Sequence, residues 1–536
     1  MQPAWPCQPH FGELCAYRDL GVLSRADVEL AQSSGLRVHV YRTVPPSFHH
    51  GFFNASKPSE VRSGKVCDFM RAPCTPPDPP RNQPGYSTPL NEWLTGAKHC
   101  ADVPLLAKLL ALGALPGVHT DEPSLAHLFV VPFLGGFVER VSPAMTNTLD
   151  REQRQGRGIV DRLAEHLPHF SNATAARHLF LLTNSCGGCL RQPCHRCATW
   201  QLSKAGSAGI ELAATLGPSW PVDQIPGSRK PPVGRRWLRQ LVVPPNVMET
   251  EFFPPKYVPL CGFGGSGRGN DASAGACRPN TAEKELLAFY QGAHSFNGIR
   301  DAILRELSKM VFGSPPPQRP RGDGGGGKRN SADICDCGLR PSCCVNASTR
   351  VAFFHTKSHW RPVTPLGFAA TVDWMQRSRF CICPPGDVPY NKRLFTALLS
   401  GCVPVLFSFR SQVKGERNWW KPRKGPGQRD IDPFYEQIDY RKLVVEVVVD
   451  EEKDLVGFIE RLREIPHAVV EEKQRAIERV RHLLLYDMSG QREDAFSSML
   501  RQLVGQLATL PTESDVGRAA LTLPRLAKVR TYGPVA

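Results

Sequence analysis

Residues 371–408 read TVDWMQRSRFCICPPGDVPYNKRLFTALLSGCVPVLFS, and this stretch decides the fold class. The apolar run 380–383 ends at two prolines and a glycine, which predicts a buried strand followed by a loop. Asn391 can cap a helix whose apolar residues share one face, and Gly401 suits the position after that helix. A second apolar run, 402–407, predicts another strand. This order implies a right-handed crossover in a parallel sheet.

Two cations, Lys392 and Arg393, fall in the first turn of that predicted helix. Positive charge there opposes the helix dipole, at a cost of about 0.3–1 kcal/mol for each exposed cation. A bound anion would offset this cost, because free backbone N–H groups at a helix N-terminus favour phosphate. Alternatively, both side chains extend into solvent.

Length and charge set the broad class of the chain. Its 536 residues exceed what one hydrophobic core organises, so we expect two domains with insertions. The formal net charge is +16, which suits a polyanionic partner: a sugar nucleotide, an acidic polysaccharide, nucleic acid or an anionic membrane. Charge alone does not choose among these partners.

The 18 cysteines favour an oxidising compartment. Three N-glycosylation sequons, at Asn54, Asn172 and Asn346, agree with the lumen of the secretory pathway. However, the sequence contains neither a signal peptide nor a run of about 18 apolar residues. We therefore expect either an anchor that precedes residue 1 or a soluble protein.

Apolar runs alternate with helical patterns in two parts of the chain, which predicts two α/β domains. The first part covers residues 36–250, and its predicted strands are RVHVY at 37–41, HLFVVPF at 127–133, RHLFLLT at 177–183 and LVVPP at 241–245. The second part covers residues 251–486, with irregular insertions at 313–349 and 409–430. A leader (1–35) precedes them, and a C-terminal helix and tail (487–536) follow.

The second part contains further predicted elements. They are a strand at 286–290 (LLAFY), a basic amphipathic helix at 299–307, strands at 351–355 (VAFFH) and 443–449 (LVVEVVV), and two helices between 455 and 486 that are separated at Pro466.

The order of these motifs resembles the exostosin family of glycosyltransferases over about residues 36–486. The most specific part comprises SRFCICPPGD at 378–387, RLFTA at 393–397 and GCVPV at 401–405, followed by DPF at 432–434. The resemblance implies a GT-B fold, in which two Rossmann-like domains face a central cleft. The Pro-, Gly- and Cys-rich insertions interrupt these domains.

The resemblance also implies a function. It indicates an inverting glycosyltransferase that moves a sugar from a nucleoside-diphosphate sugar, expected to be a UDP-sugar, to a polysaccharide or glycoprotein glycan. Such an enzyme is expected in the Golgi lumen or membrane, to need no metal or other cofactor and to bind no nucleic acid. A membrane would be contacted only through an anchor outside this sequence, and homo- or hetero-oligomers are compatible with the family.

We expect the donor to bind in the second domain. Arg393 is our candidate for neutralising the diphosphate, and Arg300 is a second phosphate ligand or, alternatively, a surface charge. Asp387 binds a donor hydroxyl or stabilises a turn. The complete predicted donor site comprises Arg300, Gly386, Asp387, Asn391, Lys392, Arg393 and Thr396.

Two departures from the family pattern motivate an alternative function: Thr396 stands where the family often has an acidic residue, and the first-domain motif is shortened to Ala176-Arg177-His178. A further departure is His127, which replaces a usual aspartate. The alternative is a non-catalytic exostosin-like subunit that binds glycan or a partner. The catalytic base remains unassigned, and its candidates are Asp121, Glu122, His127 and Glu139.

Cysteine spacing and charge allow a third hypothesis, a zinc-dependent nucleic-acid binder. Cys186, Cys189, Cys194 and Cys197 form a C-x₂-C-x₄-C-x₂-C cluster, which fits two local disulfides or one zinc site. Asp430-Ile431-Asp432 matches the D-x-D motif of metal-dependent transferases, although the resemblance implies no metal.

Two further motifs leave alternatives open. The basic loop around Trp419 and Trp420 could stack sugars, contact nucleic acid or be a solvated insertion. Cys381 and Cys383 are expected on one side of their strand as buried thiols or as partners in disulfides.

Overall fold

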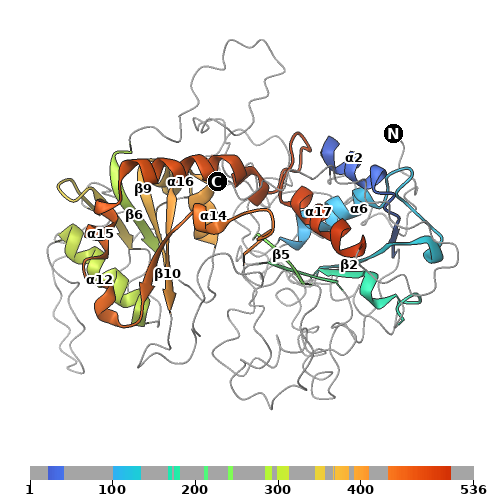
Figure 1. Ribbon diagram of the computed structural model, residues 1–536, viewed down its shortest axis with the longest axis horizontal. Helices are drawn as coiled ribbons and strands as arrows, with labels where there is room; N and C mark the ends of the chain where they lie inside the picture. Colours follow the sequence, from blue (N-terminus) through green and yellow to red (C-terminus); the bar gives the residue numbers. More distant parts are fainter. Residues whose placement is uncertain are drawn as a thin grey trace, which may run out of the picture.

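The computed structural model describes residues 22–41, 101–134, 167–171, 174–181, 210–214, 240–244, 284–292, 298–312, 344–355, 366, 368–384, 392–409 and 432–508. In these ranges the strands form two sheets, which we call the N-terminal sheet and the C-terminal sheet. Figure 1 shows the two sheets side by side along the long axis of the molecule. The prediction of a mixed α/β protein with parallel sheets is confirmed.

The N-terminal sheet consists, in the described residues, of five parallel strands whose spatial order equals their chain order. They are β1 (Val38–Val40), β2 (Leu128–Leu134), β3 (His178–Leu181), β4 (Ile210–Ala214) and β5 (Gln240–Val243). Four of them correspond to predicted strands. The fifth, β4, was missed because its sequence, IELAA, is short and only partly apolar.

The C-terminal sheet has the described strand order β11-β10-β9-β6-β8-β7. All neighbours are parallel except β7, which pairs antiparallel with β8. The strands are β6 (Leu286–Gly292), β7 (Val345–Asn346), β8 (Val351–His355), β9 (Ser378–Cys383), β10 (Val403–Phe409) and β11 (Val445–Val449). The strand predicted at 443–449 begins two residues later, because Leu443 follows a 3-10 turn.

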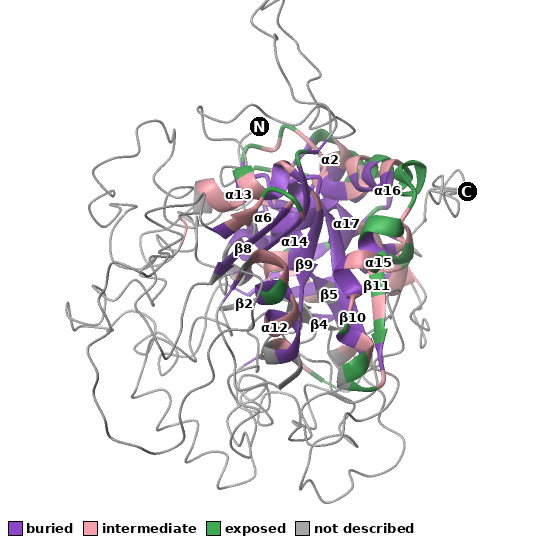
Figure 2. Ribbon diagram, turned by 90° about the vertical axis from the view of Figure 1, so that its left-hand side faces the viewer, coloured by how far each residue is buried: buried purple, intermediate pink, exposed green. Residues whose placement is uncertain are grey.

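Eight α-helices connect or cover the sheets in the described ranges. They are α2 (Arg25–Ser33), α6 (Asp102–Leu112), α12 (Gly298–Phe312), α13 (Phe368–Gln376), α14 (Lys392–Leu399), α15 (Phe458–Glu464), α16 (His467–Val480) and α17 (Ala495–Ala508). Short 3-10 turns are η2 (Pro123–Leu125), η3 (Ala175–Arg177), η9 (Tyr440–Lys442), η10 (Glu452–Leu455) and η11 (Arg481–Leu484). Figure 2 shows largely buried strands, whereas α15 and α16 each expose one face.

The crossover predicted from residues 371–408 is present as β9-α14-β10. Helix α14 begins at Lys392, so Lys392 and Arg393 do occupy its first turn. Gly401 ends the helix with φ +69°, a left-handed conformation that glycine adopts without strain. The Gly401 N–H donates to the Leu398 carbonyl and the Cys402 N–H to the Ala397 carbonyl, each at 3.0 Å, which is the Schellman arrangement.

A disulfide joins Cys381 in β9 to Cys402, the residue before β10. It links the two strands that flank α14, and therefore fixes the end of this helix relative to the sheet. Cys383, on the same strand, remains a buried free thiol. Of the two cysteines on β9, Cys381 is thus disulfide-bonded and Cys383 is reduced.

The chain changes direction within the C-terminal sheet. It steps from β6 through α12 to β8, then returns past β6 to β9 and continues outward to β10 and β11. Strands β6 and β9 are parallel neighbours whose following segments lead to opposite sides of the sheet. In open α/β sheets, ligands bind outside the carboxyl ends of strands at such a switch point.

The last helix returns to the N-terminal sheet, because α17 packs against β5 and α2. A fully buried ion pair, Lys108 Nζ to Asp494 Oδ2 at 2.7 Å, fastens the start of α17 to α6. The Tyr486 hydroxyl donates to the Pro244 carbonyl at 2.8 Å. Residues 495–508, which the sequence placed beyond both domains, therefore complete the core around the N-terminal sheet (Figure 1).

Candidate functional site

The predicted phosphate ligand Arg393 lies against the carboxyl end of β6. Its guanidinium carbon is 4.9 Å from the centroid of the Tyr290 ring, within the range of a cation–π interaction. The approach is close because Gly292 has no side chain. A Cβ built on Gly292 would lie 2.6 Å from Arg393 Nη2 and 2.3 Å from the Tyr290 hydroxyl. The backbone of β6, an aromatic ring and the Arg393 guanidinium thus meet at one point.

Two helices begin beside this point. Helix α14 follows β9, and α12 follows the neighbouring strand β6, so both N-termini lie at the carboxyl edge of the C-terminal sheet. Each helix carries cations in its first turn: Lys392 and Arg393 in α14, and the half-buried Arg300 in α12. Free backbone N–H groups, two dipoles and three cations make this edge suited to a polyanion such as a diphosphate.

Tyr290 is the residue that the sequence did not identify. It is fully buried, yet its hydroxyl has no hydrogen-bond partner within the described residues. A buried phenol usually finds a partner, so this hydroxyl is available to a bound ligand. The signal in the sequence was a tyrosine at the end of an otherwise apolar run, LLAFY, directly before Gln291-Gly292.

The Cys383 thiol borders the same site. Burial raises its pKa to about 12, although the nearby Arg393 charge lowers it in part. The thiol is therefore protonated at neutral pH and does not act as a nucleophile. Its proximity to Arg393 again places the guanidinium at the carboxyl end of β9.

Thr396 lies one turn deeper in α14. Its side chain is buried, and its hydroxyl donates to the Lys392 carbonyl at 2.9 Å. The hydroxyl proton therefore forms a hydrogen bond within α14, as is common for helical threonines. The remaining predicted donor ligands, Gly386, Asp387 and Asn391, lie outside the described residues.

Three base candidates in the first domain, Asp121, Glu122 and His127, precede β2 and so lie at its amino end, opposite the edge where ligands bind in open parallel sheets. Exposed Asp121 pairs with the His119 ring at 3.2 Å, and Glu122 accepts from the Ser124 hydroxyl at 2.7 Å. His127 Nδ1 accepts the Arg37 backbone N–H at 3.0 Å. These contacts give the three side chains local structural roles. Glu139 lies outside the described residues.

The shortened motif at 176–178 places His178 in the core. Its Nδ1 hydrogen-bonds the Thr174 carbonyl at 2.9 Å, and its Nε2 hydrogen-bonds the Tyr41 hydroxyl at 2.8 Å. The ring stacks on Phe129 with centroids 4.5 Å apart. Burial lowers the pKa of His178 to about 4, so the ring is neutral at pH 7. His178 is a satisfied core histidine.

Asn346 is the one sequon asparagine that the described residues contain. Its side-chain nitrogen donates to the Met310 carbonyl at 2.8 Å, and its Oδ1 accepts from the Ser348 backbone at 2.9 Å. A glycan on this nitrogen would have to accommodate the contact with Met310. Asn54, Asn172, the cluster at 186–197 and the loop at 409–430 lie outside the described residues.

In the part of the chain that the structure describes, no group of three or more His, Cys, Asp or Glu side chains is arranged to hold a metal ion. Asp432 of the D-x-D motif is fully buried next to Tyr440, whose pKa is raised by burial and by this carboxylate. No described helix has the length and apolar character needed to cross a membrane.

Comparison with known proteins identifies relatives of the C-terminal part. Residues 276–463 match the family model of the exostosin GT47 domain. A probable β-1,4-xylosyltransferase of Arabidopsis thaliana is 29% identical over 135 residues, which are 25% of this chain and 27% of the relative. A probable arabinosyltransferase of the same plant is 30% identical over 118 residues, 22% of each chain.

A probable glucuronosyltransferase of Physcomitrium patens is 29% identical over 140 residues, 26% of each chain. The chain therefore spans about a quarter of the length of these curated relatives. The matched domain contains both helix N-termini, Tyr290 and Gly292. Through residues 276–463, the chain therefore matches the exostosin GT47 domain and is similar to glycosyltransferases.

Proposed function

We propose that this chain is an inverting glycosyltransferase that transfers a sugar from a UDP-sugar to a polysaccharide or glycoprotein glycan. In this proposal the two sheets belong to the two Rossmann-like domains of a GT-B enzyme, at 36–250 and 251–486. The donor binds the second domain and the acceptor binds the first. We further propose that the reaction takes place in the Golgi lumen and requires no metal.

One observation carries the proposal: Arg393 stacks on Tyr290 where two helices begin beside the β6–β9 switch point. When a nucleoside diphosphate leaves, negative charge develops on its phosphate oxygens. Cations and N–H groups stabilise that charge most when the protein already holds them in position before the reaction. The aromatic face and the missing Gly292 side chain fix Arg393. The relatives are named for the transfer of xylosyl, glucuronosyl and arabinosyl groups.

The residues divide the chemistry as follows. Arg393, Lys392 and Arg300 neutralise the diphosphate, and the backbone N–H groups at the start of α14 donate to its oxygens. The Tyr290 hydroxyl donates to the donor from the end of β6. Gly386, Asp387 and Asn391 complete the donor site in this proposal. Deprotonation of the acceptor hydroxyl requires a base that none of the described candidates supplies.

A second function, a non-catalytic subunit that binds glycan or a partner, is favoured by Thr396 and His178. Thr396 offers no carboxylate to donor hydroxyls, and its own hydroxyl donates to Lys392. His178 is neutral and enclosed in the core. Such a subunit would retain glycan binding without turnover.

Calorimetry with UDP and a hydrolysis screen with several sugar nucleotides test the proposal. We expect Arg393→Ala to abolish measurable UDP binding while the circular dichroism spectrum is unchanged, and Lys309→Ala, an exposed cation of α12, to bind as wild type. Turnover that persists in EDTA would support the metal-independent reaction. Binding of UDP by Arg393→Ala with wild-type affinity would refute the donor site. Glycan binding without turnover of any donor would favour the second function.

A further inference from the structure

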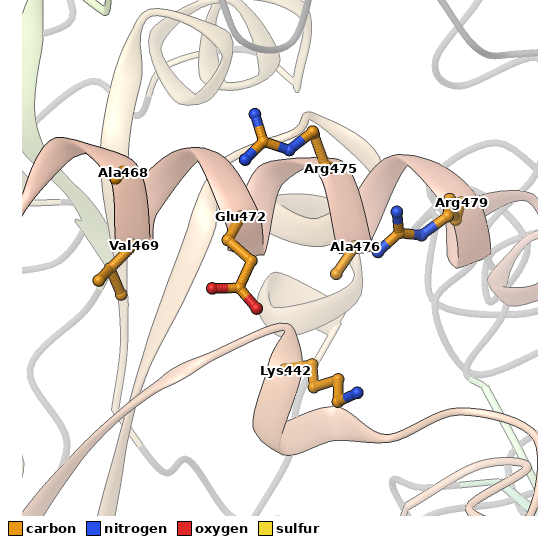
Figure 3. A pocket seen from close by; sticks show the side chains of 7 residues that line it. All are labelled: Lys442, Ala468, Val469, Glu472, Arg475, Ala476 and Arg479. Carbon is orange, nitrogen blue, oxygen red and sulfur yellow. The ribbon is translucent and has the colours of Figure 1, made fainter. Parts of the chain in front are cut away.

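A surface groove, lined by none of the donor-site candidates, lies between helix α16 and the turn η9. Its volume is about 460 Å³, and α16 forms one wall while Lys442 of η9 forms the other. Figure 3 shows Glu472 and Ala476 of α16 facing the segment that carries Lys442. The lining of α16 runs from Ala468 to Arg479, a length of about 17 Å at 1.5 Å per residue.

The floor of the groove is apolar and shallow. Ala468 and Val469 are exposed, and Val469 leaves 38% of its surface in contact with solvent. Ala476, two turns further along, continues the floor. The opposite face of α16 buries Val470 and Ile477 in the core, so the groove is a second apolar stripe on a helix that is already packed. Small side chains allow a ligand backbone to approach closely.

Positive charge predominates around this floor. Lys442, Arg475 and Arg479 line the groove, whereas Glu472 is its single carboxylate, so the lining carries a net charge of +2. Arg475 is partly compensated by Glu471, at 3.7 Å. Lys442 and Arg479 have no ion-pair partner within the residues that the structure describes. The Asp439 carboxylate acts electrostatically on Lys442 but hydrogen-bonds Arg441, so Lys442 and Arg479 border one apolar surface as two cations without a direct ion pair among the described residues.

The two walls are fixed relative to each other. The Lys473 ammonium, half-buried between them, donates to the Arg441 carbonyl at 3.0 Å and so ties α16 to η9. In η9 and directly beside it, Ile438, Tyr440 and Leu443 are buried in the core. The groove is thus formed before any ligand arrives, which reduces the entropic cost of binding.

We propose that this groove docks an acidic peptide segment of a partner protein, one that places apolar side chains on Ala468 and Val469 and carboxylates on Lys442 and Arg479. Charge complementarity selects an acidic ligand. The aliphatic floor favours a peptide over a glycan chain, because sugar rings are commonly held on aromatic faces and none of the lining residues is aromatic. The proposal is independent of glycosyl transfer.

The test measures fluorescence anisotropy of a labelled twelve-residue peptide built from Glu, Leu and Ala, at about 0.1 M salt. We expect the pair Lys442→Glu and Arg479→Glu to weaken binding at least tenfold. The control pair, Lys309→Glu and Arg463→Glu, changes the net charge by the same amount on exposed positions of α12 and α15. We expect it to weaken binding less than twofold.

A second variant distinguishes binding in the groove from a general electrostatic attraction between an acidic peptide and a basic protein. Ala468→Trp fills the exposed floor without changing charge, and we expect it to weaken peptide binding at least fivefold. Equal losses in both charge pairs, wild-type affinity of Ala468→Trp, or no binding to the wild type would each overturn the proposal. A heparin-derived hexasaccharide that loses affinity through the groove pair, while the peptide does not, would assign the groove to a glycan instead.

Discussion

The Arg393 guanidinium lies over the face of the Tyr290 ring, 4.9 Å from its centroid, and Gly292 lies so close to both that a Cβ there would clash with each. The cation is therefore held at the carboxyl end of β6, where α14 begins. This relationship separates two tasks of Tyr290: the ring positions Arg393, and the hydroxyl is left to contact a ligand.

Replacing Tyr290 by phenylalanine tests the second task. The ring remains, so Arg393 keeps its position and the free energy of unfolding should be unchanged or about 1 kcal/mol higher, because a buried hydroxyl without a partner is removed. UDP binding should weaken about tenfold, as expected for a lost hydrogen bond to a charged group. Calorimetry and urea unfolding measure both. Tyr290→Leu, which also removes the ring, should bind still more weakly; equal binding by wild type and Tyr290→Phe would exclude a ligand contact.

Replacing Gly292 by alanine tests the packing around Arg393. The added Cβ would lie 2.6 Å from Arg393 Nη2, so the guanidinium must move and UDP binding should fall at least tenfold. Gly505→Ala is the matched control, because a Cβ at that helical position meets nothing within 4 Å. We expect Gly505→Ala to leave binding intact and to raise the free energy of unfolding by about 0.5–1 kcal/mol. Similar UDP affinities for the two variants would contradict this account.

Removing one partner of the buried ion pair Lys108–Asp494 should destabilise the protein strongly. Lys108→Met leaves the Asp494 carboxylate buried without its cation, and we expect the free energy of unfolding to fall by about 3–5 kcal/mol at pH 7. Adding Asp494→Asn should restore part of this loss, because a neutral amide is cheaper to bury. For comparison, Arg25→Met removes an exposed pair with Glu29 and should cost less than about 1 kcal/mol. Equal costs for the two single variants would show that the buried pair is not special.

The lowered pKa of His178 predicts a pH dependence of stability. Its pKa is about 4 in the folded protein and near 6.5 when unfolded, so the unfolded state binds more protons between these values. The contribution of His178 to the free energy of unfolding is therefore fully present above pH 6.5. It falls by about 2 kcal/mol between pH 7 and pH 5. His178→Asn should be less stable at pH 7 but show a shallower decline. The exposed His467→Asn is the control, and parallel pH profiles for wild type and His178→Asn would refute the assignment.

Local chemistry made much of the C-terminal sheet predictable. The apolar run before Pro384, the capping residue Asn391 and the glycine at 401 predicted the strand, the helix start and the helix end without reference to the rest of the chain. Helix α13 was also within reach, because buried Val372 and Met375 are three residues apart. Its short length and the tryptophan among its apolar residues hid that spacing.

The parts that the sequence did not predict depend on contacts between distant residues. The stacking of Arg393 on Tyr290 joins positions in different elements, and the bond between Cys381 and Cys402 requires the pairing of β9 with β10. The return of α17 to the N-terminal sheet depends on Lys108 and Asp494, which are 386 residues apart. Patterns within one segment carry no information about such partners.

The path of α17 has a consequence for biosynthesis. The ribosome makes α2, α6 and the strands of the N-terminal sheet first, but the helix that packs against α2 and β5 is made only after the C-terminal sheet. Until residues 495–508 emerge, solvent reaches the apolar surface of α6 and β5. Lys108 also lacks its ion-pair partner until then. Since nascent domains usually fold in order from the N-terminus, the N-terminal sheet must stay without this helix until residues 495–508 have been made, and we expect the chain to depend on chaperones during that interval.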